Sequence, residues 1–351
     1  MKVIDLFSGV GGLSLGFSMV GMEIVFAVEH DKAIANTYKL NHHSTDMFCA
    51  DIESLDIDKL KKQYGAIDIV IGGPPCQGFS QKGKRLSLDD ERNYLFKFFI
   101  EFVEKFEPKY FLLENVPNLI TTSNGFFKDE IIKRFNELGY FIDVDVLLAS
   151  EFGIPQNRRR AFFLGRKGTK KLNLPKPTYE KTTVGEAIYD MPIIHSGEGE
   201  ETFNYATEPA NSYQKLMRQG SEVIYNHQAT KHSPLSLKKL SMIPKGKGKE
   251  VLPEEYLTKS IYSGTWTRLD EDGFAPTITT RFDTPSSGMF THPELNRCLT
   301  VREGARIQSF PDSFIFYGSK SSQLKQVGNA VPPLLAYEIA KVIEKDFENA
   351  E

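Results

Sequence analysis

Short apolar runs alternate with amphipathic stretches over the N-terminal half of the chain. The apolar runs leave little room for polar alternation, which is typical of buried strands, and they cover residues 3–7, 24–28, 66–71, 110–113 and 141–148. The amphipathic stretches show helical spacing, and they cover residues 13–19, 30–41, 95–106, 131–138 and, near the C-terminus, 301–308 and 334–347. The alternation of strands and helices predicts an α/β fold with a doubly wound, mostly parallel sheet.

Beyond residue 166 the pattern becomes irregular, and proline and glycine become frequent. Residues 195–265 are polar and loop-rich, with weak periodicity. A chain of 351 residues is long enough for about two domains. We therefore expect a larger domain formed by residues 1–170 and completed by residues 320–351. Residues 171–319 are expected to form a smaller, loop-rich domain with the hinge.

The charge of the chain is nearly balanced. Lys and Arg number 43 and Asp and Glu 46, so the formal charge of −3 gives no global indication of a nucleic-acid partner. Two stretches depart from this balance: residues 158–181 hold nine Lys or Arg and one acid, and residues 231–250 hold six Lys and one acid. Any neutralisation of phosphates is expected from such local patches.

The three cysteines, Cys49, Cys76 and Cys298, are far apart in the sequence. This spacing argues against a disulfide framework and against a cysteine zinc site, and the histidines lack metal-ligand spacing. No run of 18 apolar residues is present, and the N-terminus has no apolar signal core. We expect a cytoplasmic protein with reduced cysteines, no bound metal and no membrane partner.

A strand-to-helix turn is predicted at Gly9, Gly11 and Gly12. Glycine lets a ligand approach the backbone, and a helix N-terminus attracts polar groups. Glu29 ends the next predicted strand, where a carboxylate accepts hydrogen bonds from ribose hydroxyls. The dinucleotide pattern GxGxxG requires glycine where Ser14 stands, so the turn favours a nucleoside cofactor without a pyrophosphate, such as S-adenosylmethionine, over NAD. The alternative is a glycine turn with a structural role only.

A second glycine-containing loop follows a predicted buried strand, at residues 72–80, Gly-Gly-Pro-Pro-Cys-Gln-Gly-Phe-Ser. Two prolines fix the backbone before Cys76, and the glycines allow close approach of a substrate. A single cysteine usually packs in a core, but the neighbours here are turn formers. The loop also lies at the end of a strand, where doubly wound folds bind ligands. Cys76 is therefore a candidate nucleophile.

Residues 5–9, Asp-Leu-Phe-Ser-Gly, together with residues 72–80 resemble the cytosine-5 DNA methyltransferase family. Four further motifs match in the family's order, and they are Glu-Asn-Val at 114–116, Pro-Gln-Asn-Arg-Arg-Arg at 155–160, Arg-Glu-Gly-Ala-Arg-Ile-Gln-Ser-Phe-Pro-Asp at 302–312 and Gln-Val-Gly-Asn-Ala-Val-Pro at 326–332. The resemblance spans residues 3–333 apart from the middle of the chain. The compact length is similar to that of bacterial or phage enzymes of restriction–modification systems.

The resemblance implies transfer of a methyl group from S-adenosylmethionine to carbon 5 of a cytosine flipped out of double-stranded DNA. It implies that the Cys76 thiolate attacks carbon 6 and that Glu114 contacts N3 and the exocyclic amine of the ring. Arg158 and Arg160 are expected on one face of a strand, gripping O2 of the cytosine and flanking phosphates. The base that removes the carbon-5 proton is not identified, and water or hydroxide is one option.

The resemblance also implies a methyl-donor site. Phe7 is expected to pack on the adenine, Glu29 to hold the ribose, and His30 to stand where the family often has a large aromatic side chain. The expected donor contacts are Phe7, Gly9, Gly11, Gly12, Glu29, His30, Asp51, Ile52, Pro74, Leu95, Asn329 and Ala330. The last two require the C-terminal helix to rejoin the first domain. The expected DNA contacts are Gln77, Ser80, Gln156 and Arg281.

The leading interpretation is a site-specific DNA (cytosine-5-)-methyltransferase, working as a monomer alongside a restriction endonuclease for the same site. Residues 171–319 would recognise the target sequence, with residues 302–312 as a structural organiser. One alternative is a relative that methylates transfer RNA, although Gly-Phe-Ser at 78–80 favours DNA. Another is a catalytically silent DNA-binding regulator, against which intact Cys76 and Glu114 argue.

Overall fold

The computed structural model describes residues 1–75, 94–257 and 264–349. The chain divides into two compact units: the first consists of Met1–Leu148, Arg159–Pro177 and Pro333–Glu351, and the second of Ala149–Arg158 and Thr178–Pro332. These limits differ from the expected domain boundaries in three places. Residues 149–158 belong to the second unit, residues 171–177 belong to the first unit, and the chain returns to the first unit at Pro333 and not at residue 320.

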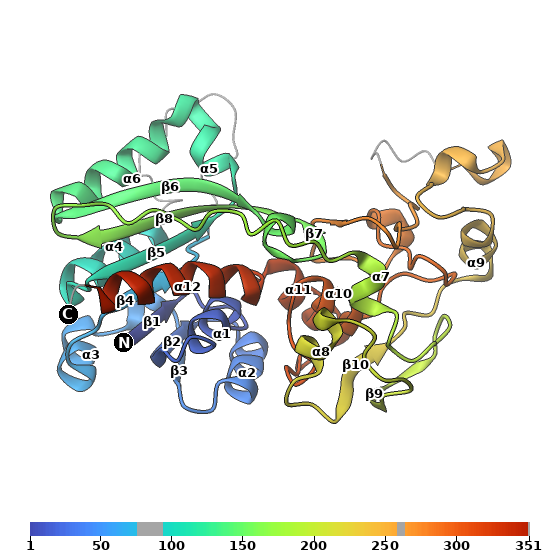
Figure 1. The fold of residues 1–351 in the computed structure, drawn as a ribbon, viewed down its shortest axis with the longest axis horizontal. Coiled ribbons are helices and arrows are strands. Elements are labelled where there is room, and N and C mark those ends of the chain that lie inside the picture. Colours follow the sequence, from blue (N-terminus) through green and yellow to red (C-terminus); the bar gives the residue numbers. More distant parts are fainter. Residues whose placement is uncertain (76–93, 258–263, 350–351) are drawn as a thin grey trace. The chain divides into compact units, whose positions relative to one another are not determined.

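A seven-stranded sheet lies at the centre of the first unit (Figure 1). Its order is β3 (Asp46–Cys49), β2 (Glu23–Glu29), β1 (Lys2–Leu6), β4 (Ile69–Gly72), β5 (Tyr110–Asn115), β8 (Arg159–Lys167) and β6 (Tyr140–Leu148). The strands from β3 to β5 are parallel, whereas β8 is antiparallel to both of its neighbours. The prediction of a mostly parallel α/β sheet is confirmed. The strand order reverses between β1 and β4, which is where doubly wound folds bind ligands.

The helices of the first unit include all those predicted there, with ends shifted by a few residues. They are α1 (Gly12–Ser18), α2 (Lys32–Asn41), α3 (Ile57–Tyr64), α4 (Tyr94–Phe106), α5 (Asn118–Thr121), α6 (Phe126–Glu137) and α12 (Pro333–Glu348). α3 was not predicted because only Ile57 and Leu60 are buried along it. Its signal is the N-cap, where the Asp56 side chain accepts a hydrogen bond from the Lys59 amide at 3.0 Å.

An aromatic core packs α4 and α6 against the sheet. Phe99 and Phe102 of α4 are fully buried. Phe111 of β5 stacks on Phe135 of α6, with 4.0 Å between the ring centroids. Burial of each such side chain stabilises the fold by about 1.5–3 kcal/mol relative to exposure. This core fixes the strands whose carboxyl ends carry the motifs.

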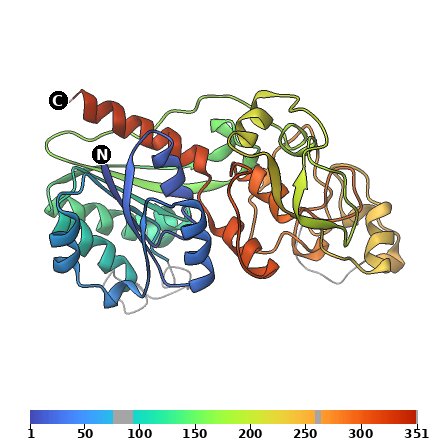
Figure 2. The same ribbon diagram turned by 90° about the horizontal axis from the view of Figure 1, so that it is seen from below.

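The C-terminal helix α12 packs on α1 near the start of the chain (Figure 2). A Cβ atom on Gly16 of α1 would lie 2.4 Å from the Cβ of Ala336, so this crossing requires glycine. At the other end of α12, Asp346 accepts hydrogen bonds from Tyr110 at 2.6 Å and from Arg166 at 2.7 Å. The expected return of the C-terminal helix to the first unit is therefore observed. Among the described residues, no helix has both the length and the apolarity needed to cross a membrane.

The second unit is built from short elements. They are β7 (Gln156–Asn157), α7 (Val184–Ile188), β9 (Gly199–Asn204), α8 (Ser212–Arg218), β10 (Val223–Gln228), α9 (Pro234–Ser241), β11 (Ala275–Pro276), α10 (Val301–Ile307) and α11 (Lys320–Asn329). β9 and β10 are antiparallel, and β7 pairs in parallel with β11. The region predicted to be loop-rich therefore contains regular structure, but in pieces too short to produce a clear period in the sequence.

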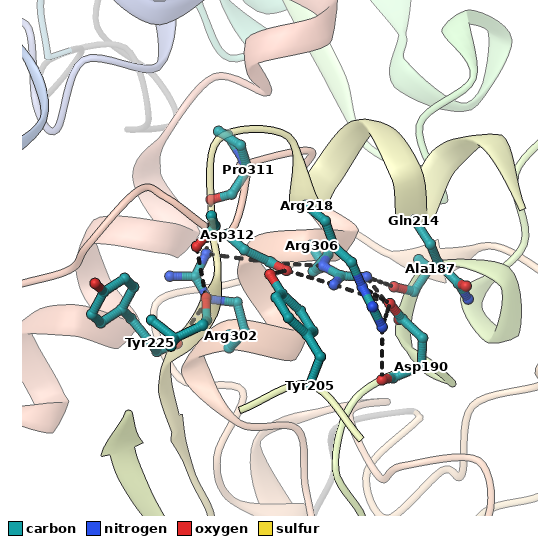
Figure 3. A network of polar contacts seen from close by, with 12 residues as sticks. Ala187, Asp190, Tyr205, Gln214, Arg218, Tyr225, Arg302, Arg306, Pro311 and Asp312 are labelled. Carbon is teal, nitrogen blue, oxygen red and sulfur yellow. Dashed lines mark hydrogen bonds and ion pairs between the residues drawn. The ribbon is translucent and has the colours of Figure 1, made fainter. Parts of the chain in front are cut away.

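A buried network of charges holds the centre of the second unit (Figure 3). The fully buried Arg306 donates to Asp312 at 2.7 Å and 2.6 Å and to Asp190 at 2.8 Å. Arg218 also pairs with Asp190, at 2.6 Å. The neighbouring Arg302 is fully buried and donates to backbone carbonyls, among them that of Tyr225 at 2.8 Å. The structural role expected for these arginines agrees with this geometry.

Replacing Arg306 with methionine tests the network. The Arg306→Met variant leaves the Asp190 and Asp312 carboxylates buried without this guanidinium, and we expect a loss of about 3–5 kcal/mol in the free energy of unfolding. Chemical denaturation measures the change. As a control, Lys341→Met breaks an exposed pair with Glu338 and should change stability by less than about 0.5 kcal/mol. Equal effects of the two substitutions would contradict the assigned role.

Candidate active site

The glycine-rich turn joins the end of β1 to α1. Phe7, Gly9 and Gly11 all have positive φ, at 57°, 56° and 89°, and Gly11 is the N-cap of α1, which begins at Gly12. The two glycines of the turn, Gly9 and Gly11, differ in how much space surrounds them. No described atom lies within 4 Å of the place that a Cβ on Gly9 would take, whereas a Cβ on Gly11 would lie 2.2 Å from His42 Nε2. The turn is therefore open at Gly9 and tightly packed at Gly11.

Glu29, at the end of β2, stabilises this turn through hydrogen bonds to its carboxylate. Its Oε2 accepts a hydrogen bond from the Gly9 amide at 3.2 Å, and its Oε1 accepts one from the Asp31 amide at 2.8 Å. Burial raises the pKa of Glu29. The carboxylate stands beside the open side of the turn, and ribose binding by Glu29 stays a prediction. His30 is next to it, with its ring 3.1 Å from Glu29 and its side chain 80% exposed.

The other predicted donor contacts of the first unit lie in varied surroundings. Asp51 is exposed and caps a short 3₁₀ turn by accepting from the Glu53 amide at 3.3 Å. Ile52 is buried in the hydrophobic core, and Leu95 packs against the same core. Pro74 is buried shortly after the end of β4. Their contacts with a methyl donor remain predictions.

A second group of polar side chains lies at the ends of β4, β5 and β8. Arg160 Nε is 2.8 Å from Glu114 Oε1, and the two side chains are 15% and 14% exposed. A Cβ on Gly73 would lie 2.8 Å from Glu114 Oε2, so glycine leaves room for the carboxylate. Asn115 Nδ2 donates to the Pro74 carbonyl at 3.0 Å and fixes the chain that leads into the cysteine loop. Cys76, Gln77 and Ser80 themselves lie outside the described residues.

Arg158 does not share a strand face with Arg160, and this expectation is wrong. β8 begins at Arg159, and Arg158 belongs to the second unit. It is fully buried and donates to the carbonyls of Ile278 at 3.0 Å and Gly328 at 2.8 Å. The alternation rule fails here because it applies only within one continuous strand. We assign Arg158 a structural role instead of contact with the cytosine.

Gln156 is likewise an interior residue of the second unit and not an exposed DNA contact. It is fully buried, its amide nitrogen donates to Gln308 Oε1 at 2.7 Å, and its amide oxygen accepts from the Ile278 amide at 2.8 Å.

The remaining predicted contacts of the second unit differ in exposure. Arg281 has a side chain that is 58% exposed and pairs with Asp283 at 3.1 Å. Asn329 is exposed and Ala330 buried at the end of α11, also in the second unit.

Much of the positive charge of the two basic stretches is already paired. In the first stretch, Arg166 pairs with Asp346 at 2.7 Å, Lys167 with Glu107 at 2.7 Å and Lys171 with Asp143 at 2.9 Å. In the second, Lys245 pairs with Glu271, and Lys239 is buried with its ammonium 5.1 Å from the Trp266 ring centroid. Within the described parts of the chain, Arg159, Lys170, Lys176, Lys181, Lys231 and Lys247 form no ion pair. Fewer cations are thus available for phosphates than the sequence indicated.

Sequence reasoning treated Ser14 only as a departure from the dinucleotide pattern. In the structure it is fully buried, and its hydroxyl lies 2.6 Å from Asp5 Oδ2 and 2.7 Å from Tyr38 Oη. The missed signal is Asp5 itself, because an acid inside an apolar strand needs a polar partner. No group of three His, Cys, Asp or Glu side chains suitable for a metal occurs in residues 1–75, 94–257 and 264–349.

Comparisons with known proteins identify the family of the chain. The profile of the family described as C-5 cytosine-specific DNA methylase matches residues 1–345. The chain belongs to this family. It is 40% identical over 377 residues to the type II methyltransferase M.DdeI of Desulfomicrobium norvegicum, covering 99% of this chain and 90% of that protein. It is 39% identical over 350 residues to the type II methyltransferase M1.HphI of Haemophilus parahaemolyticus, covering 98% and 87%.

Solved structures support the same fold for this methylase. A structure described as a DNA modification methyltransferase encoded within an E. coli prophage superposes with a TM-score of 0.81 at 30% identity, covering 99% of both chains. The Dnmt2 methyltransferase of S. pombe superposes with a TM-score of 0.60 at 18% identity, covering 98% of this chain and 99% of that one. This second likeness concerns the fold alone.

The two turn glycines provide a stability test. Gly9→Ala places a side chain at positive φ in open space and should cost about 1–2 kcal/mol. Gly11→Ala adds a collision with the imidazole of His42 and should cost about 1–3 kcal/mol more. Urea unfolding of the two variants in parallel measures the difference. A Gly9→Ala variant less stable than Gly11→Ala would contradict the assignment of the open and packed sides.

Proposed function

We propose that this methylase transfers a methyl group to carbon 5 of a flipped-out cytosine in double-stranded DNA through a covalent adduct with Cys76. The observation that carries the proposal is the Glu114–Arg160 pair at the end of β5, held beside the Pro74 carbonyl that Asn115 fixes. Cys76 follows Pro75 in the sequence, and we propose that its thiolate acts together with this pair. A flipped base is required because carbon 6 of a stacked cytosine is inaccessible.

In the proposed reaction, the Cys76 thiolate forms a bond to carbon 6 of the ring. This addition opens the double bond between carbons 5 and 6, and the displaced electron pair makes carbon 5 nucleophilic. Carbon 5 would then take the methyl group as the methyl–sulfur bond of the donor breaks, with its electron pair staying on the sulfur of the departing thioether. Glu114 hydrogen-bonds to N3 and the exocyclic amine, and it stabilises the charge that develops there. Arg160 orients the Glu114 carboxyl and offers further N–H donors to O2. Loss of the carbon-5 proton, to water or hydroxide, then expels Cys76 and restores the ring.

S-adenosylmethionine supplies the electrophilic methyl group when bound. The residues of the turn fit a nucleoside of this kind, because Gly9 is open to a ligand and the Glu29 carboxylate stands beside it. The buried Ser14 occupies the position at which a dinucleotide-binding turn has glycine. We assign Glu29 to the ribose hydroxyls and Phe7 and Ile52 to the adenine. Asn329 and Ala330 are further proposed contacts.

The second unit is proposed to recognise the target sequence. Three of its cations are suited to phosphates: Lys231 and Lys247, which form no ion pair within the described residues, and the exposed Arg281, which pairs with the single carboxylate of Asp283. Lys245 is less suited because it pairs with two carboxylates, those of Glu271 and Glu294. The type II names of the relatives support a role in a restriction–modification system. We further propose a cytoplasmic monomer that protects DNA from an endonuclease of the same specificity.

Trapping on DNA that contains 5-fluorocytosine tests the covalent mechanism. Fluorine at carbon 5 cannot leave as a proton does, so the wild-type protein should accumulate as an adduct that survives denaturing electrophoresis. Cys76→Ser should bind DNA without forming the adduct, and Cys49→Ser, which changes an exposed cysteine, should trap normally. Trapping on a matched RNA alone would favour the RNA-methylating alternative, and DNA binding with no adduct would favour the silent regulator.

A second test addresses Glu114. In Glu114→Gln the amide oxygen still accepts from Arg160, but the ionisable carboxyl is lost, so kcat should fall by about 10²–10⁴ while the affinity for the methyl donor is unchanged. Glu107→Gln is a matched control, because Glu107 is exposed and pairs only on the surface, with Lys167. A kcat for Glu114→Gln within a few-fold of the wild type would contradict the role assigned to this carboxyl.

A further inference from the structure

A chain of three buried side chains lies behind the glycine-rich turn. Asp5 of β1, Ser14 of α1 and Tyr38 of α2 are all fully buried. The Ser14 hydroxyl lies 2.6 Å from Asp5 Oδ2 and 2.7 Å from Tyr38 Oη, so it links the other two. Asp5 Oδ1 is buried and has no hydrogen-bond partner among the described residues. Three separate elements of the first unit are therefore joined through one hydroxyl.

This chain is in direct contact with the turn. The Tyr38 ring stacks on the imidazole of His42, with 4.2 Å between the centroids. A Cβ on Gly11 would lie 2.2 Å from that imidazole and 2.7 Å from the Tyr38 ring. Gly11 is the N-cap of α1, and Ser14 lies within the first turn of the same helix. We therefore expect a change in the direction or length of these hydrogen bonds to shift the backbone at Gly11 and, with it, the backbone at Gly9.

The hydrogen bonds of the chain can run in two directions. Ser14 and Tyr38 each contribute one hydroxyl proton. When Asp5 is ionised, Tyr38 donates to Ser14 and Ser14 donates to Asp5. When Asp5 is protonated, the order reverses, and the Tyr38 proton turns to Thr45, whose side chain also hydrogen-bonds to Tyr38. In both states each hydroxyl proton has an acceptor, and the two states differ only by the buried negative charge of Asp5.

The groups that face Asp5 favour its neutral form. Burial raises the pKa of Asp5 to about 7, the hydrogen bonds from Ser14 act in the opposite direction, and the negative charge of Glu29 on β2 raises it further. Tyr38 on α2 and His42 at its end are titratable, and burial keeps both uncharged by raising the pKa of Tyr38 and lowering that of His42 to about 4. No cation is among the groups that shift the pKa of Asp5 in the described structure.

We propose that Asp5, Ser14 and Tyr38 are positioning residues for the methyl-donor site, and that Asp5 takes up a proton when a donor binds at Glu29. This inference rests on the proposed function. A Glu29 carboxylate that accepts ribose hydroxyls is most effective when ionised. Two neighbouring buried carboxylates resist carrying charge together, so fixing the charge on Glu29 favours a neutral Asp5. Donor affinity is then linked to pH through Asp5.

Titration calorimetry of S-adenosylmethionine between pH 6 and pH 8.5 tests the linkage on the full-length protein. The donor's own α-amino group titrates in this range, so the comparison between variants is decisive. Above about pH 7 the wild-type Kd should rise relative to that of Asp5→Asn by up to about tenfold per pH unit, the limit for one proton. Ser14→Ala removes a hydrogen bond that favours ionised Asp5, so the inflection should move to higher pH.

The outcomes separate this proposal from the proposed function. Parallel pH curves for the wild type and Asp5→Asn would overturn the proton linkage while leaving the methyl-donor site intact. Failure of the wild type to bind S-adenosylmethionine at any pH would overturn the donor site itself. If Asp5→Asn does not fold, as judged by thermal melting, calorimetry of the wild type in two buffers of different ionisation enthalpy decides, because it counts the protons taken up directly. Zero uptake at pH 7 would contradict the proposal.

Discussion

The site depends on how closely β4 approaches β1. A Cβ on Gly72, the last residue of β4, would lie 2.3 Å from the carbonyl oxygen of Leu6 at the end of β1, so only glycine permits this pairing. The contact sets the glycine-rich turn and the chain entering the cysteine loop side by side, at the point where the strand order reverses. β5 pairs next to β4 and ends in Glu114 and Asn115. A single sheet edge thus carries the proposed donor turn and the groups proposed to act on the cytosine.

The two units use ion pairs in different ways. Arg306 and its carboxylates are buried, and the pairing is fixed because breaking it would leave charges in a medium that cannot solvate them. The Glu114–Arg160 pair is partly exposed, so exchange of one partner for a substrate group costs less. A pair that must repeatedly exchange water for a base is better placed at a partly open edge than in a core. The difference in burial therefore separates a structural pair from one suited to chemistry.

The sequence predicts features that depend on local spacing and fails where partners come from distant positions. The parallel sheet, the helices and the turn at Gly9 and Gly11 follow from short-range periodicity and from the conformational needs of glycine. The same reasoning placed Arg158 beside Arg160, although a strand boundary between them puts Arg158 in another unit. It also counted Arg166 and Lys167 as available cations, because Asp346 and Glu107 are remote in sequence and reach them only in the folded chain. A count of charged residues within one stretch does not show which of them pair with residues far away in the sequence.

Two motif side chains predicted to contact DNA, those of Gln156 and Arg158, are buried inside the second unit. Gln156 and Arg158, both in a motif shared with the family, bond to the backbone at Ile278, and Gln308 of a second motif donates to the Val327 carbonyl at 2.7 Å. These side chains join β7, α10 and α11 inside the second unit. Their polar groups form hydrogen bonds with buried backbone N–H and C=O groups. A unit made of short elements needs such bonds because few of its backbone groups are paired within helices or sheets. A scaffold fixed in this way leaves the remaining loops free to differ in sequence, which is what a unit proposed to select a target requires.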